Sequence, residues 1–127
     1  MKKLVYIIDD DPVTGFLHSN LLQKLGFAKS SIDLHNSPIN ALSKICRKIE
    51  CNLPLPKLIL LDVEMPEMSG FDFVNKLNKI KSFDQKIRIL VISSKQENEL
   101  MHELNSNYIP TFINKPLSLD KLEAAFG

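Results

Sequence analysis

Three aspartates of this 127-residue chain stand at the ends of apolar runs, where carboxylates could bind a metal ion or attack phosphorus. The run 58–61 ends at Asp62, and the earlier run 4–8 ends at Asp9 and Asp10. Short unbroken apolar runs are typical of strands covered on both faces of a parallel sheet. Open α/β sheets bind their ligands at the carboxyl ends of such strands. A lone aspartate there could equally cap the strand or the next helix, so the interpretation depends on the neighbouring groups.

Ser93 and Lys115 follow two later apolar runs, 87–92 and 110–113. The carboxyl ends of parallel strands meet at one edge of a sheet, so these groups are expected beside the three aspartates. Alone, Lys115 would be interpreted as a surface lysine before a helix. Its occurrence with three acidic strand ends favours a functional role instead. A cis bond before Pro116 would direct the lysine back toward the site.

The chemistry of this group of residues favours Mg²⁺ and phosphoryl transfer. Three ionised carboxylates held close together repel each other, and hard oxygen ligands select Mg²⁺. A carboxylate beside Mg²⁺ can attack phosphorus and form an aspartyl phosphate, while Lys115 neutralises charge on the phosphoryl oxygens. Ser93 could donate a hydrogen bond to one of those oxygens. His18, His35 and His102 fall at no predicted strand end, which argues against zinc, and each is expected to be solvated or to cap an element.

Helical spacing between the strands supplies the scaffold for these residues. Asp11 and Pro12 predict a helix start and Gly26 its end, and further helices are expected after Ser37, after Gly70, over 96–104 and after Ser118. With a weak strand at 32–35, strands and helices alternate five times. This predicts one doubly wound α/β domain, a five-stranded parallel sheet with five helices on two faces. The residues expected on the buried helix faces are Leu17, Leu21, Leu22 and Leu25; Ile39, Leu42, Ile45, Cys46 and Ile49; Phe71, Val74, Leu77 and Ile80; Leu100, Met101 and Leu104; and Leu119, Leu122 and Phe126.

Composition places the chain among single-domain globular proteins. Hydrophobic residues make up 44% and the net charge is +1 with mixed signs, so nothing points to direct binding of nucleic acid or a membrane. The apolar runs are too short to span a bilayer, and the start does not resemble a signal peptide. Cys46 and Cys51 have no metal-binding spacing. Free thiols in a reducing cytoplasm are expected, with a disulfide as the lesser alternative.

Four motifs are similar to those of bacterial response regulators. IIDDDP at 7–12, LLDVEMPEMSG at 60–70, LVISS at 90–94 and NKP at 114–116 resemble, in order and spacing, the receiver domain of the chemotaxis regulator family. The resemblance covers essentially the whole chain, so residues 1–127 are expected to form one receiver domain. It implies a flavodoxin-like sheet in the order 2-1-3-4-5, which the alternation of elements did not give. It also implies a cytoplasmic two-component phosphorelay.

The resemblance implies a role for each matching acidic residue. Asp62 would accept a phosphoryl group from a sensor histidine kinase or a histidine phosphotransfer protein. Asp10 and Asp62 would bind Mg²⁺ directly, together with the backbone carbonyl of Glu64, and Asp9 would act through water. Lys115 would pair with the phosphoryl group. The chain would then be a phosphoacceptor switch, catalysing only its own phosphoryl transfer and autodephosphorylation.

The resemblance also implies a switch and a lifetime for the phosphorylated state. Ser93 and Phe112 would move inward and change the face from the fourth to the fifth strand, which an unknown output partner would bind. A weak homodimer on phosphorylation is compatible with this. Phe112 stands where relatives often have Tyr, and it cannot form that residue's outward hydrogen bond. Glu64 and Lys95 are expected to meet above the site and to slow autodephosphorylation.

Two other functions are open at this point. A Mg²⁺-dependent phosphohydrolase could use Asp62 as nucleophile and Glu64 as acid and base, but the loop after Asp62 is short and no cap segment encloses a substrate. A plain nucleotide-binding α/β domain would need a glycine-rich loop, and Gly15 stands alone after the first strand. The phosphoacceptor switch is the favoured interpretation.

Overall fold

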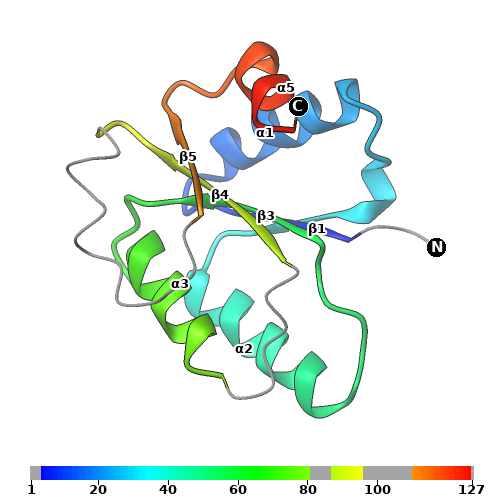
Figure 1. Ribbon diagram of the computed structural model, residues 1–127, viewed down its shortest axis with the longest axis vertical. Helices are drawn as coiled ribbons and strands as arrows, with labels where there is room; N and C mark the ends of the chain where they lie inside the picture. The colour runs from blue at the N-terminus through cyan, green and yellow to red at the C-terminus, as the bar shows by residue number, and fades with distance from the viewer. Residues whose placement is uncertain (1–3, 81–86, 96–109, 127) are drawn as a thin grey trace.

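The computed structural model describes residues 4–80, 87–95 and 110–126 (Figure 1). Its centre is one parallel sheet in the order β2-β1-β3-β4-β5, so the predicted sheet and strand order are confirmed. The apolar runs seen in the sequence form its strands. No strand boundary differs from the predicted one by more than one residue. The strands are β1 Val5–Ile8, β2 Ile32–His35, β3 Leu58–Asp62, β4 Arg88–Ser93 and β5 Thr111–Asn114.

Helices cover both faces of the sheet. Helices α1 (Pro12–Lys24) and α5 (Leu119–Phe126) lie on one face, and α2 (Pro38–Glu50) and α3 (Gly70–Asn78) lie on the other (Figure 1). A short 3-10 helix, η1 (Lys29–Ser31), precedes β2. The described residues thus contain four of the five predicted α-helices, and the helix predicted over 96–104 lies outside them. Among the described residues, no helix is long and apolar enough to cross a membrane.

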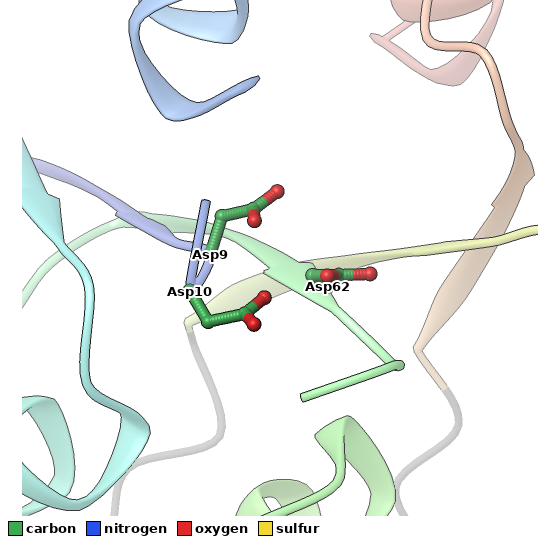
Figure 2. Close-up of side chains that lie close together, drawn as sticks. All are labelled: Asp9, Asp10 and Asp62. Atoms are coloured by element: carbon green, nitrogen blue, oxygen red, sulfur yellow. The ribbon is translucent and has the colours of Figure 1, made fainter. Parts of the chain in front are cut away.

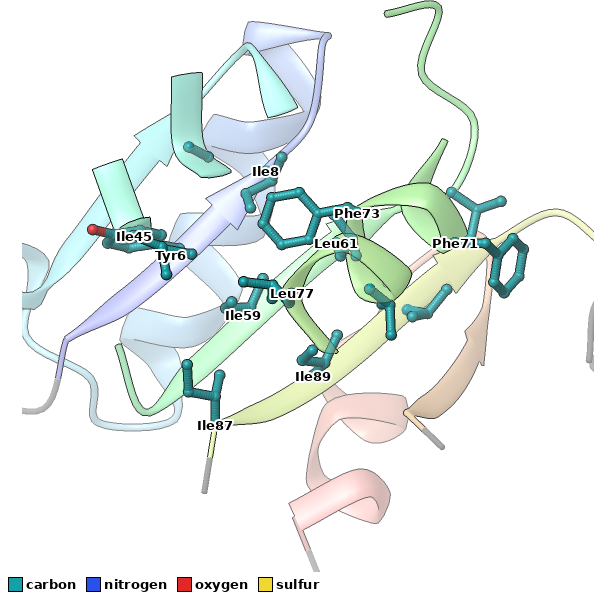
Figure 3. Packing of buried hydrophobic residues seen from close by; sticks show 14 of the residues in the cluster. Tyr6, Ile8, Ile45, Ile59, Leu61, Phe71, Phe73, Leu77, Ile87 and Ile89 are labelled. Carbon is teal, nitrogen blue, oxygen red and sulfur yellow. The ribbon is translucent and has the colours of Figure 1, made fainter. Parts of the chain in front are cut away.

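The sheet separates two hydrophobic cores, since strand side chains alternate between its faces. Val5 and Ile7 of β1 pack toward α1 and α5, together with Leu22 and Leu122. Buried side chains on the opposite face pack beneath α2 and α3 (Figure 3), and they include Tyr6, Ile8, Ile45, Ile59, Leu61, Phe71, Phe73, Leu77, Ile87 and Ile89.

Polar residues begin the helices, as predicted for Asp11, Ser37 and Ser118 but not for Ser69. The side chain of Asp11 accepts a hydrogen bond from the Val13 N–H, and those of Ser37, Ser69 and Ser118 accept from backbone N–H groups in the first turns of α2, α3 and α5. Gly26 follows α1 with a φ of 103°, a conformation that glycine adopts without strain. Cys46 and Cys51 are free, as expected.

The predicted buried faces of α1 and α2 are partly wrong. Leu17 is 55% exposed and Ile39 is 47% exposed. Apolar and polar side chains are both spread around α1, so the spacing of its leucines does not define one inward face. The helix buries Gly15, His18, Ser19 and Leu22, and it leaves Val13, Phe16 and Leu17 in water.

Candidate functional site

Three carboxylates meet at the carboxyl edge of the sheet (Figure 2). Asp9 and Asp10 follow β1, and Asp62 is the last residue of the adjacent strand β3. Carboxylate oxygens of the three residues lie within 4.8 Å of one another. Asp9 and Asp62 are each 5% exposed, whereas Asp10 is open to solvent. Neighbouring parallel strands thus bring together the three aspartates that the sequence placed at strand ends.

Burial and the neighbouring carboxylates make Asp9 costly to ionise. Burial raises the pKa of Asp9 to about 6; the nearby carboxylates of Asp62 and Asp10 add to the rise, and the hydrogen bond from the Asp11 N–H at 2.9 Å opposes it. A divalent cation would relieve this repulsion, and the donors are the hard oxygens that Mg²⁺ prefers. The residues present therefore fit a Mg²⁺ ion.

Lys115 provides the positive side of the site. Its Nζ lies 2.9 Å from Oδ1 of Asp62 and 3.9 Å from Oε2 of Glu64. Its peptide bond to Pro116 is cis. Burial lowers the pKa of Lys115, but the hydrogen bond and charge of Asp62 more than offset this and raise the pKa above its ordinary value. Lys115 is therefore a fixed cation on the predicted phosphoacceptor.

Ser93 lies at the end of β4, beside the strand that carries Asp62. It is 2% exposed, and its Oγ accepts a hydrogen bond of 3.0 Å from the Lys95 N–H. The carbonyl of Ser93 accepts a hydrogen bond of 2.8 Å from the Lys115 N–H. Strand β4 thus links the predicted hydroxyl directly to the residue that carries the ammonium group.

Glu64 has a hydrogen-bond partner that the sequence did not predict. Its Oε1 accepts hydrogen bonds from the N–H and the hydroxyl of Ser94. These bonds, and after them the nearby charges of Lys115 and Lys95, lower the pKa of Glu64. Ser94 lies in the LVISS motif, but sequence spacing does not show which of two adjacent serines faces Glu64. The sequence therefore does not predict these hydrogen bonds. The Glu64 side chain consequently lies between Ser94 and Lys115.

Gly70 is a second residue whose role the sequence did not reveal. A Cβ added there would lie 2.9 Å from the carbonyl oxygen of Asp62 and 3.0 Å from Cα of Val63. The lack of a side chain therefore lets α3 begin directly against the loop that follows Asp62.

The predicted switch residue Phe112 is half-buried, and its ring centroid lies 6.1 Å from that of Phe71 in α3.

The predictions for two of the three histidines are wrong. His35 ends strand β2, and its carbonyl accepts a 3.0 Å hydrogen bond from the Asp9 N–H. Its ring lies against Tyr6, with centroids 4.4 Å apart, and not in solvent. His18 is only 8% exposed because α1 turns it inward, and burial lowers its pKa. His102 lies outside the described residues. Within the described ranges, the three aspartates are the only cluster of metal-binding residue types that could hold an ion.

A family comparison covers almost the whole chain. Residues 5–126 match the family model described as response regulator receiver domain. The chain is 31% identical over 123 residues to hybrid signal transduction histidine kinase D of Dictyostelium discoideum. That alignment covers 97% of this chain but 7% of the kinase, so the chain corresponds to a small part of that protein.

Two further comparisons cover most of both proteins. Sporulation initiation phosphotransferase F of Bacillus subtilis is 24% identical over 125 residues, which are 98% of this chain and 91% of the relative. Among solved structures, chemotaxis protein CheY4 of Vibrio cholerae superimposes with a TM-score of 0.79 at 21% identity, covering 99% of this chain and 97% of that one. This structural likeness shows that the two share a fold.

Proposed function

The chain belongs to the response regulator receiver domain family, and from this premise we propose that residues 1–127 form one phosphoacceptor switch centred on Asp62. It is a receiver domain of two-component signalling. The phosphoryl group would come from a sensor histidine kinase or a histidine phosphotransfer protein. We place this exchange in the cytoplasm, and we propose no activity beyond the chain's own phosphorylation and dephosphorylation.

The observation that supports this proposal best is the asymmetry of the surroundings of Asp62. The Lys115 ammonium lies 2.9 Å from one of its oxygens, while the carboxylates of Asp9 and Asp10 lie within 4.8 Å of it. Asp9, Asp10 and Asp62, with the backbone carbonyl of Glu64, would hold Mg²⁺. When bound, Mg²⁺ would neutralise charge on the phosphoryl oxygens and on the carboxylates.

The chain's own residues then have distinct parts in the transfer. An oxygen of Asp62 forms a bond to phosphorus while the bond from phosphorus to the donor's histidine nitrogen breaks, and the electron pair stays on that nitrogen. Lys115 neutralises one phosphoryl oxygen, and the hydroxyl of Ser93 donates a hydrogen bond to another. To make this hydrogen bond, Ser93 would move toward the phosphoryl group together with the end of β4. Phe112, packed beside Phe71, would follow inward, and phosphorylation would favour that state.

Phosphorylation by a small donor tests the proposal directly. Wild-type protein incubated with acetyl phosphate and Mg²⁺ should gain one phosphoryl group that is labile to base, and mass spectrometry of the intact chain measures it. Asp62→Asn should gain none, whereas Asp72→Asn, at an exposed position in α3, should react like wild type. Equal labelling of Asp62→Asn and wild type would refute the assignment of the acceptor.

The output of the switch is proposed to lie on the face from β4 to β5. Residues 93–114 should show changes in NMR chemical shift on phosphorylation, because Ser93 lies on β4 and Phe112 lies on β5. An unknown protein, or a second phosphorylated copy held weakly, would bind this face. Shifts confined to Asp9, Asp10 and Asp62 would contradict this part of the proposal.

A further inference from the structure

Lys121 lies in the first turn of α5, and its ammonium group reaches back to the loop that carries Lys115. Its Nζ donates one hydrogen bond to the carbonyl oxygen of Asn114 and another to that of Pro116, each at 2.9 Å. These two carbonyls belong to the residues on either side of Lys115. A lysine of α5 therefore bridges both neighbours of the residue that pairs with Asp62.

The location of Lys121 in α5 opposes the ordinary preference of a cation. The first turn of a helix carries a partial positive charge, so a lysine there is unfavourable. Fixing a long lysine side chain also costs conformational entropy. The two carbonyl contacts offset these costs, since hydrogen bonds from a charged donor are stronger than those between neutral groups. Lys121 is thus held on the loop by specific contacts, against its local preference.

These contacts fix the peptide group that leads into Lys115. On one side of this group, the Lys115 N–H donates to the carbonyl of Ser93 at 2.8 Å. On the other side, the carbonyl of Asn114 accepts from Lys121. With both ends of this peptide bonded, the direction in which the Lys115 side chain leaves the backbone is restricted. That direction takes its ammonium to within 2.9 Å of Asp62 Oδ1.

We infer that Lys121 is a positioning residue: its two hydrogen bonds hold the loop 114–116 so that the ammonium of Lys115 stays on Asp62. The kinetic consequence rests on the proposed function, because only a phosphoryl transfer at Asp62 would use Lys115. The hold on Lys115 does not rest on it, because it is a property of the free chain. Lys121 acts through Lys115, because its two hydrogen bonds go to the loop and not to Asp62.

The rate of phosphorylation by acetyl phosphate tests the kinetic consequence. Lys121→Met keeps most of the side-chain length but removes the donors, and it should lower the rate by roughly tenfold, because small displacements of a catalytic group are costly. Lys121→Arg keeps charged donors and should restore most of the rate. Lys24→Met, at an exposed lysine in the last turn of α1, should change nothing. Equal rates for Lys121→Met and wild type would overturn the inference.

A second variant separates positioning from general damage to the fold. In a Lys115→Ala background there is no ammonium left to position, so adding Lys121→Met should lower the rate no further. If Lys121 only stabilised the fold, its removal would slow the reaction by the same factor in both backgrounds. That additive result would overturn the inference.

A chemical probe tests, without phosphorylation, whether Lys121 keeps the ammonium of Lys115 on Asp62. An ammonium held against a carboxylate is protected from an amine-acylating reagent, and peptide mass spectrometry reports the rate of modification at Lys115. Modification should be several-fold faster in Lys121→Met than in wild type, and unchanged in Lys24→Met. If the wild type accepts no phosphoryl group, the proposed function fails and this measurement still decides the positioning role. Equal modification of Lys115 in Lys121→Met and wild type would show that Lys121 does not hold it.

Discussion

The buried carboxylate of Asp9 is expected to destabilise the metal-free fold at neutral pH, so Asp9→Asn should stabilise it. Burial first, and then the carboxylates of Asp62 and Asp10, raise the pKa of Asp9 from 3.8 to about 6. Between these values the folded chain keeps a proton on Asp9 that the unfolded chain has released. The free energy of unfolding therefore falls as the pH rises through this window. The two pKa values correspond to a loss of about 3 kcal/mol by neutral pH.

Asp9→Asn removes the titrating group and keeps the size of the side chain. Its amide oxygen can still accept the hydrogen bond from the Asp11 N–H. At about pH 7, with a chelator present, the variant should be more stable than wild type by up to about 3 kcal/mol, or roughly 10 °C in the unfolding midpoint. The difference should disappear near pH 4, where Asp9 is protonated in the folded chain. Urea unfolding followed by circular dichroism across this pH range measures both quantities.

Two comparisons show whether the effect belongs to Asp9. Asp11 is exposed, and hydrogen bonds from the Thr14 hydroxyl and the Val13 N–H lower its pKa, so Asp11→Asn should bring no gain at neutral pH. Added Mg²⁺ should stabilise wild type more than Asp9→Asn, because a ligand stabilises the state that binds it. Equal stability of wild type and Asp9→Asn at neutral pH, or a difference that persists near pH 4, would refute the reasoning.

Replacing two helical glycines by alanine should change the free energy of unfolding in urea in opposite directions. Gly70→Ala should lower it by about 1–3 kcal/mol, because the new Cβ would lie 2.9 Å from the Asp62 carbonyl oxygen. Gly15→Ala should raise the free energy of unfolding by about 0.5–1 kcal/mol, because no neighbouring atom would lie closer than 3.9 Å to its Cβ and alanine is the better helix former. A more stable Gly70→Ala or a less stable Gly15→Ala would contradict the packing argument. Autodephosphorylation should be slow in wild type and faster in Glu64→Asn with Lys95→Ala, measured as decay of Asp62 phosphate after donor removal, because Glu64 covers the site beside Lys115. Glu64→Asn alone should account for most of that change, since Glu64 bonds to Ser94 and lies near Lys115, and the charge of Lys95 affects it least. Decay of this single variant at the wild-type rate would contradict this.

The sequence predicted those parts of the fold and site that depend on a single local property of the chain, such as the burial of a strand or the capping of a helix. Unbroken apolar runs identified the central strands, and Asp11 with Pro12 identified a helix start, because burial on both faces and N-capping act locally. The positions of Asp62 and Lys115 beside each other were predictable too, since each ends or directly follows a strand of the same sheet. The strand order required the family resemblance, because alternation of strands and helices is compatible with several orders.

The parts that were missed depend on how elements rotate or bend against each other. Leu17 was assigned to the inside of α1 because it recurs with Leu21 at helical spacing, but apolar and polar side chains are mixed around this helix, so spacing alone does not define its inward face. The pairing of Glu64 with Ser94 depends on loop conformations that residue types do not encode. The requirement for glycine at position 70 follows from how closely α3 approaches the Asp62 carbonyl. The packing of a helix against a loop sets this distance, and the residue types alone do not predict it.

The three aspartates and Lys115 of the site are attached to parts of the sheet that should open independently. Asp9, Asp10 and Asp62 follow or end β1 and β3, which have a strand on each side, whereas Lys115 follows β5, an edge strand paired with β4 alone. Amide hydrogens in edge strands exchange with solvent through local openings that leave the centre of a domain folded. Each such opening of β5 would detach the ammonium and leave the acidic half intact. Amide exchange that is faster in β5 than in β3 would therefore reveal a population that binds Mg²⁺ fully but accepts phosphoryl groups slowly.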